Sequence, residues 1–124
     1  MSYIKILAAD DIFSNQLLVM SILEEAGYYC KTVSDGKKLI EEMQNIEYDI
    51  ILTDIEMPVM NGIETVKYIR TKLPEKYNNI PVIAMTAHNR QEFLDKIENV
   101  GFTDIITKPY SIEKFKEILE KYLN

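Results

Sequence analysis

The sequence contains one cysteine and no apolar run long enough to cross a bilayer. Its first residues also lack the basic segment and cleavage site of a signal peptide. A lone cysteine, Cys30, excludes an internal disulfide and suits a reducing compartment, where we expect it to fill a buried position. These absences predict a cytoplasmic protein that does not enter a membrane.

The chain also lacks an excess of basic residues. It carries 14 Lys and Arg against 20 Asp and Glu, a net charge of −6, and its lysines are scattered among glutamates. Without a basic stripe, direct binding of nucleic acid is not expected. With 124 residues and 47% apolar residues, the composition predicts one globular domain, residues 1–124.

Short apolar runs alternate with longer segments of helical periodicity. Strands are predicted at residues 3–9, 28–33, 49–53, 81–85 and 104–107. Helices are predicted at residues 17–26, 36–46, 62–73, 91–100 and, after the cap Ser111, up to about residue 123. Gly27 and Gly101 follow two helices as stop signals, and residues 77–79 are interpreted as a loop. The alternating Lys and Glu of the last helix are interpreted as a solvated face.

Strict alternation of apolar strands and helices predicts the α/β class, with a parallel sheet covered on both faces. Right-handed crossovers make this a doubly wound, three-layer sandwich of five strand–helix units. In such sheets ligands bind beyond the carboxyl ends of the strands.

Polar residues follow four of the predicted strands at this edge: Asp10-Asp11, Asp54, Thr86 and Lys108. Taken singly, each has an ordinary interpretation as a helix cap, a turn or a loop residue. Carboxylates gathered at one edge repel, so the fold must protonate them, pair them or bind a cation. An all-oxygen cluster suits Mg²⁺, and Lys108 is placed to neutralise part of the remaining charge.

The acid pair Asp10-Asp11, the segment DIEMPVMNG around Asp54, AMTAH around Thr86 and TKPY around Lys108 resemble the receiver domains of two-component signalling. The resemblance covers the whole chain. It implies the strand order 2-1-3-4-5 of a flavodoxin-like fold. The residue Asn15 and the AMTAH segment are most similar to receivers of hybrid histidine kinases and phosphorelays.

The resemblance implies that Asp54 accepts a phosphoryl group from a phosphohistidine. The implied magnesium ligands are Asp10, directly or through water, Asp11, Asp54 and the backbone carbonyl of Glu56. Lys108 would pair with one phosphoryl oxygen, and the Thr86 hydroxyl would move onto another. The Lys108–Pro109 bond would be cis, as in relatives. The expected partners are a histidine kinase or histidine phosphotransfer protein and a downstream protein target.

Three positions leave the family's signalling in doubt. Ile105 stands where many receivers have an aromatic residue that rotates inward, so we expect plain strand filling there. A signal would then reach the face formed by the fourth and fifth strands and residues 91–100 through packing alone. Glu56 and His88 either tune the phosphoryl lifetime or are solvated loop side chains.

On the first helix, a core stripe is predicted from the helical period. Its members are Asn15, Leu18, Val19, Ile22, Leu23 and Ala26. Phe13, Leu17 and Met20 then fall on the outer side, where a soluble helix is normally polar. They are predicted either to dock the phosphohistidine donor or to be scattered exposed residues without a role.

Other classes fit less well. A flavodoxin-like cofactor binder needs a phosphate loop that Asp10-Asp11 would repel, and an aspartate-dependent phosphatase needs its nucleophile on the first strand. The remaining alternative is a pseudo-receiver, an interaction module that is never phosphorylated. In neither case is the chain expected to be an enzyme that turns over a separate substrate.

Overall fold

The computed structural model describes residues 4–87, 91 and 99–123 of the chain. A parallel five-stranded sheet forms its centre, in the order β2-β1-β3-β4-β5. The strands are β1 (Lys5–Ala9), β2 (Tyr29–Val33), β3 (Ile50–Asp54), β4 (Val82–Thr86) and β5 (Asp104–Thr107). Both the predicted α/β class and the strand order are confirmed.

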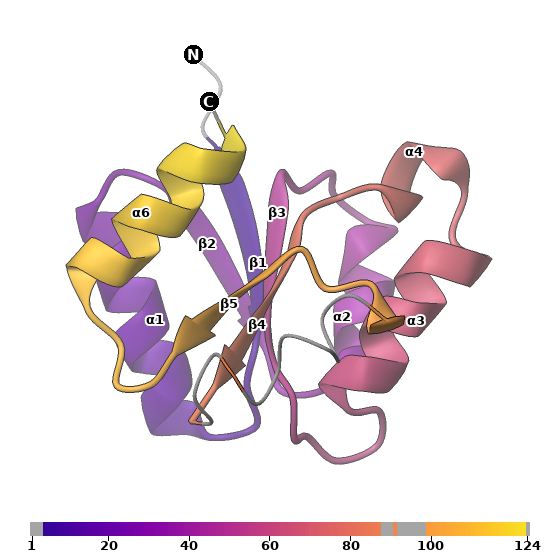
Figure 1. The fold of residues 1–124 in the computed structure, drawn as a ribbon, viewed down its shortest axis with the longest axis horizontal. Helices are drawn as coiled ribbons and strands as arrows, with labels where there is room; N and C mark the ends of the chain where they lie inside the picture. The colour runs from indigo at the N-terminus through magenta and orange to yellow at the C-terminus, as the bar shows by residue number, and fades with distance from the viewer. Residues whose placement is uncertain (1–3, 88–90, 92–98, 124) are drawn as a thin grey trace.

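Helices cover both faces of the sheet, which gives three layers (Figure 1). The described helices are α1 (Phe13–Glu25), α2 (Gly36–Met43), α3 (Gly62–Lys72), α4 (Glu75–Asn78) and α6 (Ile112–Leu123). In Figure 1, α1 and α6 lie on one side of the sheet, whereas α2, α3 and α4 lie on the other. None of them combines the length and apolar composition needed to cross a membrane.

The pleat of each central strand divides its side chains between two cores. On β1, Ile6 and Ala8 pack toward α1 and α6, whereas Leu7 and Ala9 pack toward α2 and α3. The same alternation continues along β3 and β4, whose side chains are all buried. Both sheet faces are therefore apolar, and polar chemistry is confined to the strand ends.

Several helix ends follow the predicted signals. Gly27 has φ +92°, the left-handed conformation that glycine adopts most readily, and it ends α1. Asn61 and Glu64 form a reciprocal capping box at the start of α3. The Ser111 hydroxyl accepts a hydrogen bond from the Lys114 N–H at 3.2 Å, so the predicted cap of α6 is confirmed.

Two predictions of secondary structure were wrong. The first helix begins at Phe13, four residues before the predicted start. Its N-cap, Ile12, has no capping side chain; instead Asp10 Oδ1 accepts the Ile12 N–H at 2.9 Å and begins the turn. Residues 77–79 were expected to be a loop, but a one-turn helix, α4, occupies residues 75–78, because the Pro74 carbonyl accepts N–H groups from residues 77 and 78. Most of the helix predicted at 91–100 lies outside the described residues.

Candidate functional site

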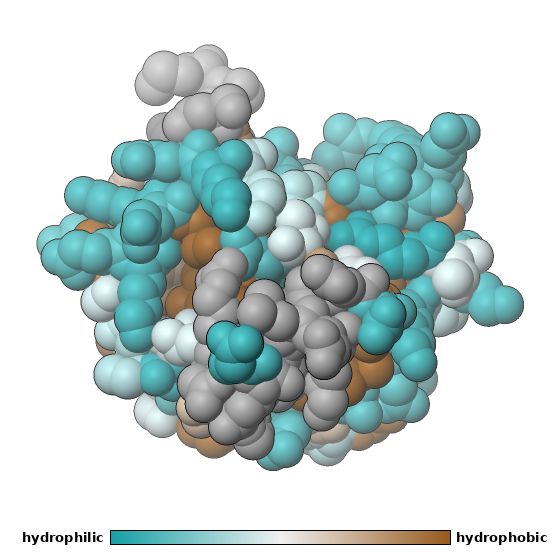
Figure 2. Space-filling view, viewed as in Figure 1, coloured by the Kyte–Doolittle hydropathy of each residue, from teal (hydrophilic) through white to brown (hydrophobic). Residues whose placement is uncertain are grey.

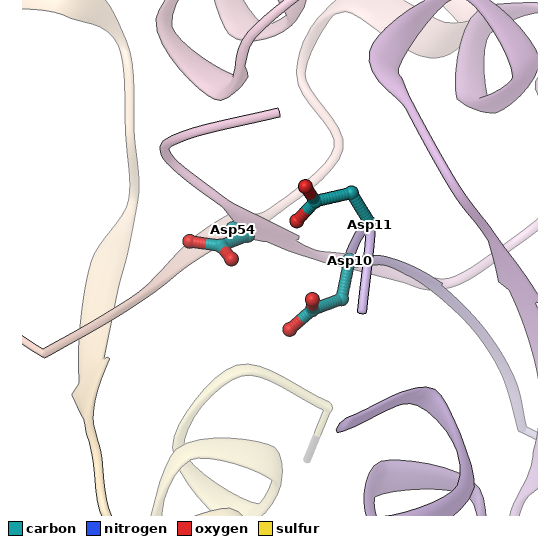
Figure 3. Close-up of side chains that lie close together, drawn as sticks. All are labelled: Asp10, Asp11 and Asp54. Carbon is teal, nitrogen blue, oxygen red and sulfur yellow. The ribbon is translucent and has the colours of Figure 1, made fainter. Parts of the chain in front are cut away.

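Three carboxylates meet beyond the carboxyl ends of β1 and β3. Asp10 and Asp11 follow β1, Asp54 is the last residue of β3, and one oxygen of each lies within 4.8 Å of the other two. Figure 3 shows the three side chains gathered in one place. Asp10 is 2% exposed and Asp54 8%, whereas Asp11 is exposed. The predicted acidic cluster is therefore present, with two of its members almost fully buried.

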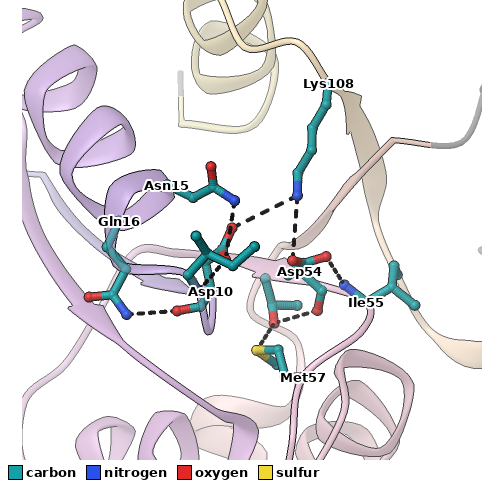
Figure 4. Close-up of polar contacts among 9 residues, drawn as sticks. Asp10, Asn15, Gln16, Asp54, Ile55, Met57 and Lys108 are labelled. Carbon is teal, nitrogen blue, oxygen red and sulfur yellow. Dashed lines mark hydrogen bonds and ion pairs between the residues drawn. The ribbon is translucent and has the colours of Figure 1, made fainter.

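Asp10 is held by several donors on the β1–α1 segment (Figure 4). Its Oδ1 accepts the Ile12 N–H at 2.9 Å and lies 3.5 Å from Asn15 Nδ2. The Gln16 side chain donates to the Asp10 carbonyl at 2.7 Å. The first turn of α1 thus fixes one face of Asp10 and leaves Oδ2 directed away from these donors.

Asp10 Oδ2 is buried and has no hydrogen-bond partner within the described part of the chain. Its nearest cation is Lys108 Nζ, at 3.9 Å. A buried carboxylate oxygen without a donor is costly, and a bound cation is one way to offset that cost. The three oxygen ligands and this unsatisfied oxygen fit the hard, oxygen-preferring Mg²⁺ ion.

Several groups around Asp54 have opposing effects on the ionisation of its carboxyl group. Its Oδ1 accepts the Ile55 N–H at 2.7 Å, and its Oδ2 lies 3.5 Å from Lys108 Nζ. Burial raises the pKa of Asp54 above its ordinary value, Lys108 lowers it in part, and Asp10 raises it again. In the absence of a metal, the ionised form of Asp54 is therefore disfavoured by the fold.

Lys108 reaches these acids from the segment that follows β5. Its backbone N–H donates to the Thr86 carbonyl at 2.7 Å, which ties this segment to the end of β4. The Lys108–Pro109 peptide bond is cis, as the resemblance implied. The ammonium therefore approaches Asp54 and Asp10 from the end of β5 (Figure 4).

The remaining predicted site residues differ in position and burial. Thr86 ends β4 and is buried at this edge. Glu56 is exposed on the loop after β3, and its carbonyl as a metal ligand stays a prediction. Ile105 is 3% exposed within the core on the α2–α3 side, which confirms it as strand filling. His88 lies outside the described residues.

The side chains exposed on the outer face of α1 agree only in part with those predicted from the sequence. Phe13 is 70% exposed and Leu17 51% exposed. Met20 was expected beside them, but it is partly buried against the α1–α6 core, with its sulfur 3.6 Å from the Thr32 hydroxyl. Leu18 was expected in the core and is 46% exposed instead. In Figure 2, brown patches interrupt the hydrophilic surface along the lower edge, below the strand ends.

Sequence reasoning missed two contributors to this site. Gln16 holds the Asp10 backbone from six residues away, a contact for which no local motif gives a signal. Asn15 was assigned to the core stripe, yet its amide faces Asp10. Both contacts depend on where α1 begins, and that start was predicted wrongly.

Comparison with known proteins gives consistent matches. The model of the protein family described as "response regulator receiver domain" matches residues 6–120. The chain is 35% identical over 105 residues to the CAI-1 autoinducer sensor kinase/phosphatase CqsS of Vibrio cholerae, covering 85% of the chain and 15% of that protein. It is 32% identical over 117 residues to the signal transduction histidine-protein kinase BarA of Escherichia coli K12, covering 94% of the chain and 12% of BarA.

Solved structures show the same similarity over almost the whole chain. Chemotaxis protein CheY4 of Vibrio cholerae superimposes with a TM-score of 0.89 and 31% identity, covering 98% of this chain and 99% of that one. The receiver domain of sensor histidine kinase PA1611 from Pseudomonas aeruginosa gives a TM-score of 0.87 and 28% identity, with 98% of both chains covered. The latter structure has a magnesium ion coordinated in its active site cleft.

Proposed function

The chain belongs to the response regulator receiver domain family, and from that premise we propose that Asp54 accepts a phosphoryl group from a phosphohistidine donor with Mg²⁺ bound. One observation carries the proposal: Asp54 lies within 4.8 Å of Asp10 and Asp11 and 3.5 Å from Lys108. A nucleophilic carboxylate, acidic metal ligands and a cation are thus gathered around one point at the sheet edge.

In the proposed reaction an Asp54 carboxylate oxygen attacks the phosphorus atom of phosphohistidine. A phosphorus–oxygen bond forms, the phosphorus–nitrogen bond breaks, and its electron pair returns to the donor's imidazole. Lys108 pairs with one phosphoryl oxygen, and the Thr86 hydroxyl binds another. The protein's contribution is mainly to position these groups and to stabilise charge.

The proposed metal ligands are Asp10, Asp11, Asp54 and the Glu56 carbonyl. When bound, Mg²⁺ offsets the charge on the transferring phosphoryl oxygens. The orphaned Oδ2 of Asp10 supports this assignment, since it lies in the cluster without a donor among the described residues. The magnesium in the PA1611 receiver supports it from a relative.

We further propose that phosphorylation changes packing at β4, β5 and the segment between them. Thr86 ends β4, and its carbonyl holds Lys108, so movement at Thr86 is transmitted to the segment after β5. Ile105 is already buried and carries no ring to rotate. The altered face then binds a downstream protein target differently.

The whole protein's role is also a proposal. The chain spans 15% and 12% of the kinases CqsS and BarA, so we place it as a cytoplasmic receiver module of a hybrid histidine kinase or phosphorelay. Its donor is then a histidine kinase or a histidine phosphotransfer domain. We do not expect it to turn over a separate substrate.

Phe13 and Leu17 are proposed to dock that donor, with Met20 at the inner border of the patch. The two exposed side chains sit on the first turns of α1, next to Asp11. Leu17→Glu should slow transfer from a protein donor at least about tenfold, because it places a charge in an apolar contact. Acetyl phosphate, which needs no docking, should label the variant normally.

The matched control for docking is Ser21→Glu, which adds the same charge one turn further along the exposed side of α1. It should leave both reactions unchanged. If Leu17→Glu slows neither reaction, or slows both equally, the patch does not serve docking.

The acceptor role is tested with a small phosphodonor and intact-mass measurement. Wild-type protein should gain the mass of one phosphoryl group with acetyl phosphate and Mg²⁺, and should gain none when EDTA replaces the metal. The Asp54→Asn variant should gain none under either condition. A wild-type chain that stays unmodified would favour the pseudo-receiver alternative.

A further inference from the structure

Lys114 lies in the first turn of α6 and binds the segment that carries Lys108. Its ammonium donates to the Thr107 carbonyl at 2.9 Å, the Pro109 carbonyl at 2.9 Å and the Thr107 hydroxyl at 3.3 Å. A lysine ammonium has three protons, so these three contacts use its full donor capacity. The residues immediately before and after Lys108 are therefore held by one side chain.

A lysine is an unexpected residue at this position of a helix. The amino end of α6 carries partial positive charge, which disfavours a cation in the first turn. The sequence pattern had also placed Lys114 on a solvated face. Lys116, two residues later on the same helix, is exposed as that pattern predicts. The three oxygen acceptors give Lys114 a specific task that outweighs the unfavourable dipole.

Lys108 depends on its backbone for its position. Its ammonium lies 3.5 Å from Asp54 Oδ2 and 3.9 Å from Asp10 Oδ2, at the long end of hydrogen-bond and ion-pair distances. The side chain is a flexible four-carbon stem, so these long contacts fix it only weakly. A shift of the segment after β5 would move the ammonium away from both carboxylates.

We propose that Lys114 is a positioning residue for phosphoryl uptake, anchoring Thr107 and Pro109 so that Lys108 is held over Asp54. This inference rests on the proposed function of Asp54. Lys114 touches neither the acids nor the transferred group, and it acts through Lys108.

The first test needs no phosphorylation. Amide hydrogen exchange is measured by NMR at Lys108, whose N–H donates to the Thr86 carbonyl. Lys114→Met should speed this exchange about tenfold, because the charged hydrogen bonds on both sides are lost. Lys116→Met, the matched control, should leave it unchanged. Equal exchange in wild type and Lys114→Met would overturn the anchoring.

The second test is a double-mutant cycle on the rate of labelling by acetyl phosphate with Mg²⁺. Lys114→Met should lower this rate about fivefold when Lys108 is present, and should cause no further loss in Lys108→Ala. Lys114→Arg keeps charge and donors, and should recover most of the rate. An equal loss in both backgrounds, or no loss in the first, would show that Lys114 does not act through Lys108.

These results separate the two proposals. A wild-type chain that gains no phosphoryl group contradicts the acceptor role of Asp54. The exchange measurement at Lys108 still decides whether Lys114 anchors the segment.

Discussion

Replacing Asp54 with asparagine removes one of three clustered charges and keeps an oxygen that accepts the Ile55 N–H. In the metal-free protein, this change should stabilise the fold. Asp54 is 8% exposed and lies within 4.8 Å of the Asp10 and Asp11 carboxylates. Its compensating cation, Lys108, stands at 3.5 Å.

The magnitude follows from these separations. At an effective dielectric constant of about 20, two like charges at the 4.8 Å limit of this cluster repel by roughly 3.5 kcal/mol. Only the buried Asp10 is counted in this way, because solvent screens the exposed Asp11, whereas the attraction between Asp54 and Lys108 at 3.5 Å is roughly 4.7 kcal/mol. The two charge interactions together favour the Asp54 carboxylate by roughly 1 kcal/mol, but removing it from water costs about 3 kcal/mol. Asp54→Asn should therefore raise the free energy of unfolding by about 2 kcal/mol near neutral pH.

The gain should depend on pH in a defined direction. Burial raises the pKa of Asp54 in the folded state, so the unfolded chain loses this proton at a lower pH. Between the two pKa values the unfolded state binds fewer protons, and the stability of the wild type falls as pH rises. The advantage of Asp54→Asn is therefore absent below the unfolded-state pKa and complete above the folded-state pKa.

Urea unfolding in EDTA, followed by circular dichroism over this pH range, measures the effect. Asp104→Asn provides the contrast: Asp104 is also buried, but Lys121 and Tyr122 bind it at 3.2 and 2.6 Å, so its loss should destabilise the fold. Adding Mg²⁺ should stabilise the wild type by mass action and narrow its gap to Asp54→Asn. A destabilised Asp54→Asn in EDTA would refute the reasoning.

Three further predictions concern the fold around the site. Gly62→Ala would place a Cβ 2.2 Å from the Asp54 carbonyl oxygen and should lower the free energy of unfolding by about 3 kcal/mol. Gly27→Ala, where the space around the Cβ is open, should lower it by only about 1 kcal/mol. Equal losses in urea unfolding would contradict this difference. Arg70 donates to four oxygens, on residues 78, 80, 101 and 103, so Arg70→Lys should lower the free energy of unfolding by roughly 2 kcal/mol in the same assay. An unchanged unfolding midpoint would argue against this role of Arg70. Burial raises the pKa of Cys30 to about 12, so its alkylation by iodoacetamide should proceed only as fast as the chain unfolds, and rapid native-state labelling would contradict its burial.

The edge cluster was predictable because parallel strands end at one side of a sheet. Once β1, β3, β4 and β5 are recognised as parallel, Asp10, Asp54, Thr86 and Lys108 must gather at that side. The apolar runs and helix-stop glycines were sufficient for this, since nearly every residue of these four strands is buried.

The burial of individual side chains on α1 was not predictable in the same way. Leu18 and Met20 both lie about 100° from the centre of the buried stripe, on opposite flanks. The β2 side covers Met20, near Thr32, whereas Leu18 stays exposed. Tertiary packing decides which flank of the helix is covered by a neighbouring element. The helical period of the sequence alone does not predict this.

The contacts of Lys114 could not be predicted from the sequence for a related reason. Two of its three acceptors are the backbone carbonyls of Thr107 and Pro109, and a sequence pattern gives no information about contacts to backbone groups. The start of α1 was missed because the Asp10 side chain begins the turn, although Asp10 stands before the helix.

The most direct measurement locates the phosphoryl group in the chain. After incubation with acetyl phosphate and Mg²⁺, borohydride reduction converts an acyl phosphate on aspartate to homoserine, and peptide mapping by mass spectrometry identifies the position. Homoserine at position 54 alone is the predicted result. Its appearance at position 10 or 11, or at no position in a chain that has gained the phosphoryl mass, would contradict Asp54 as the acceptor.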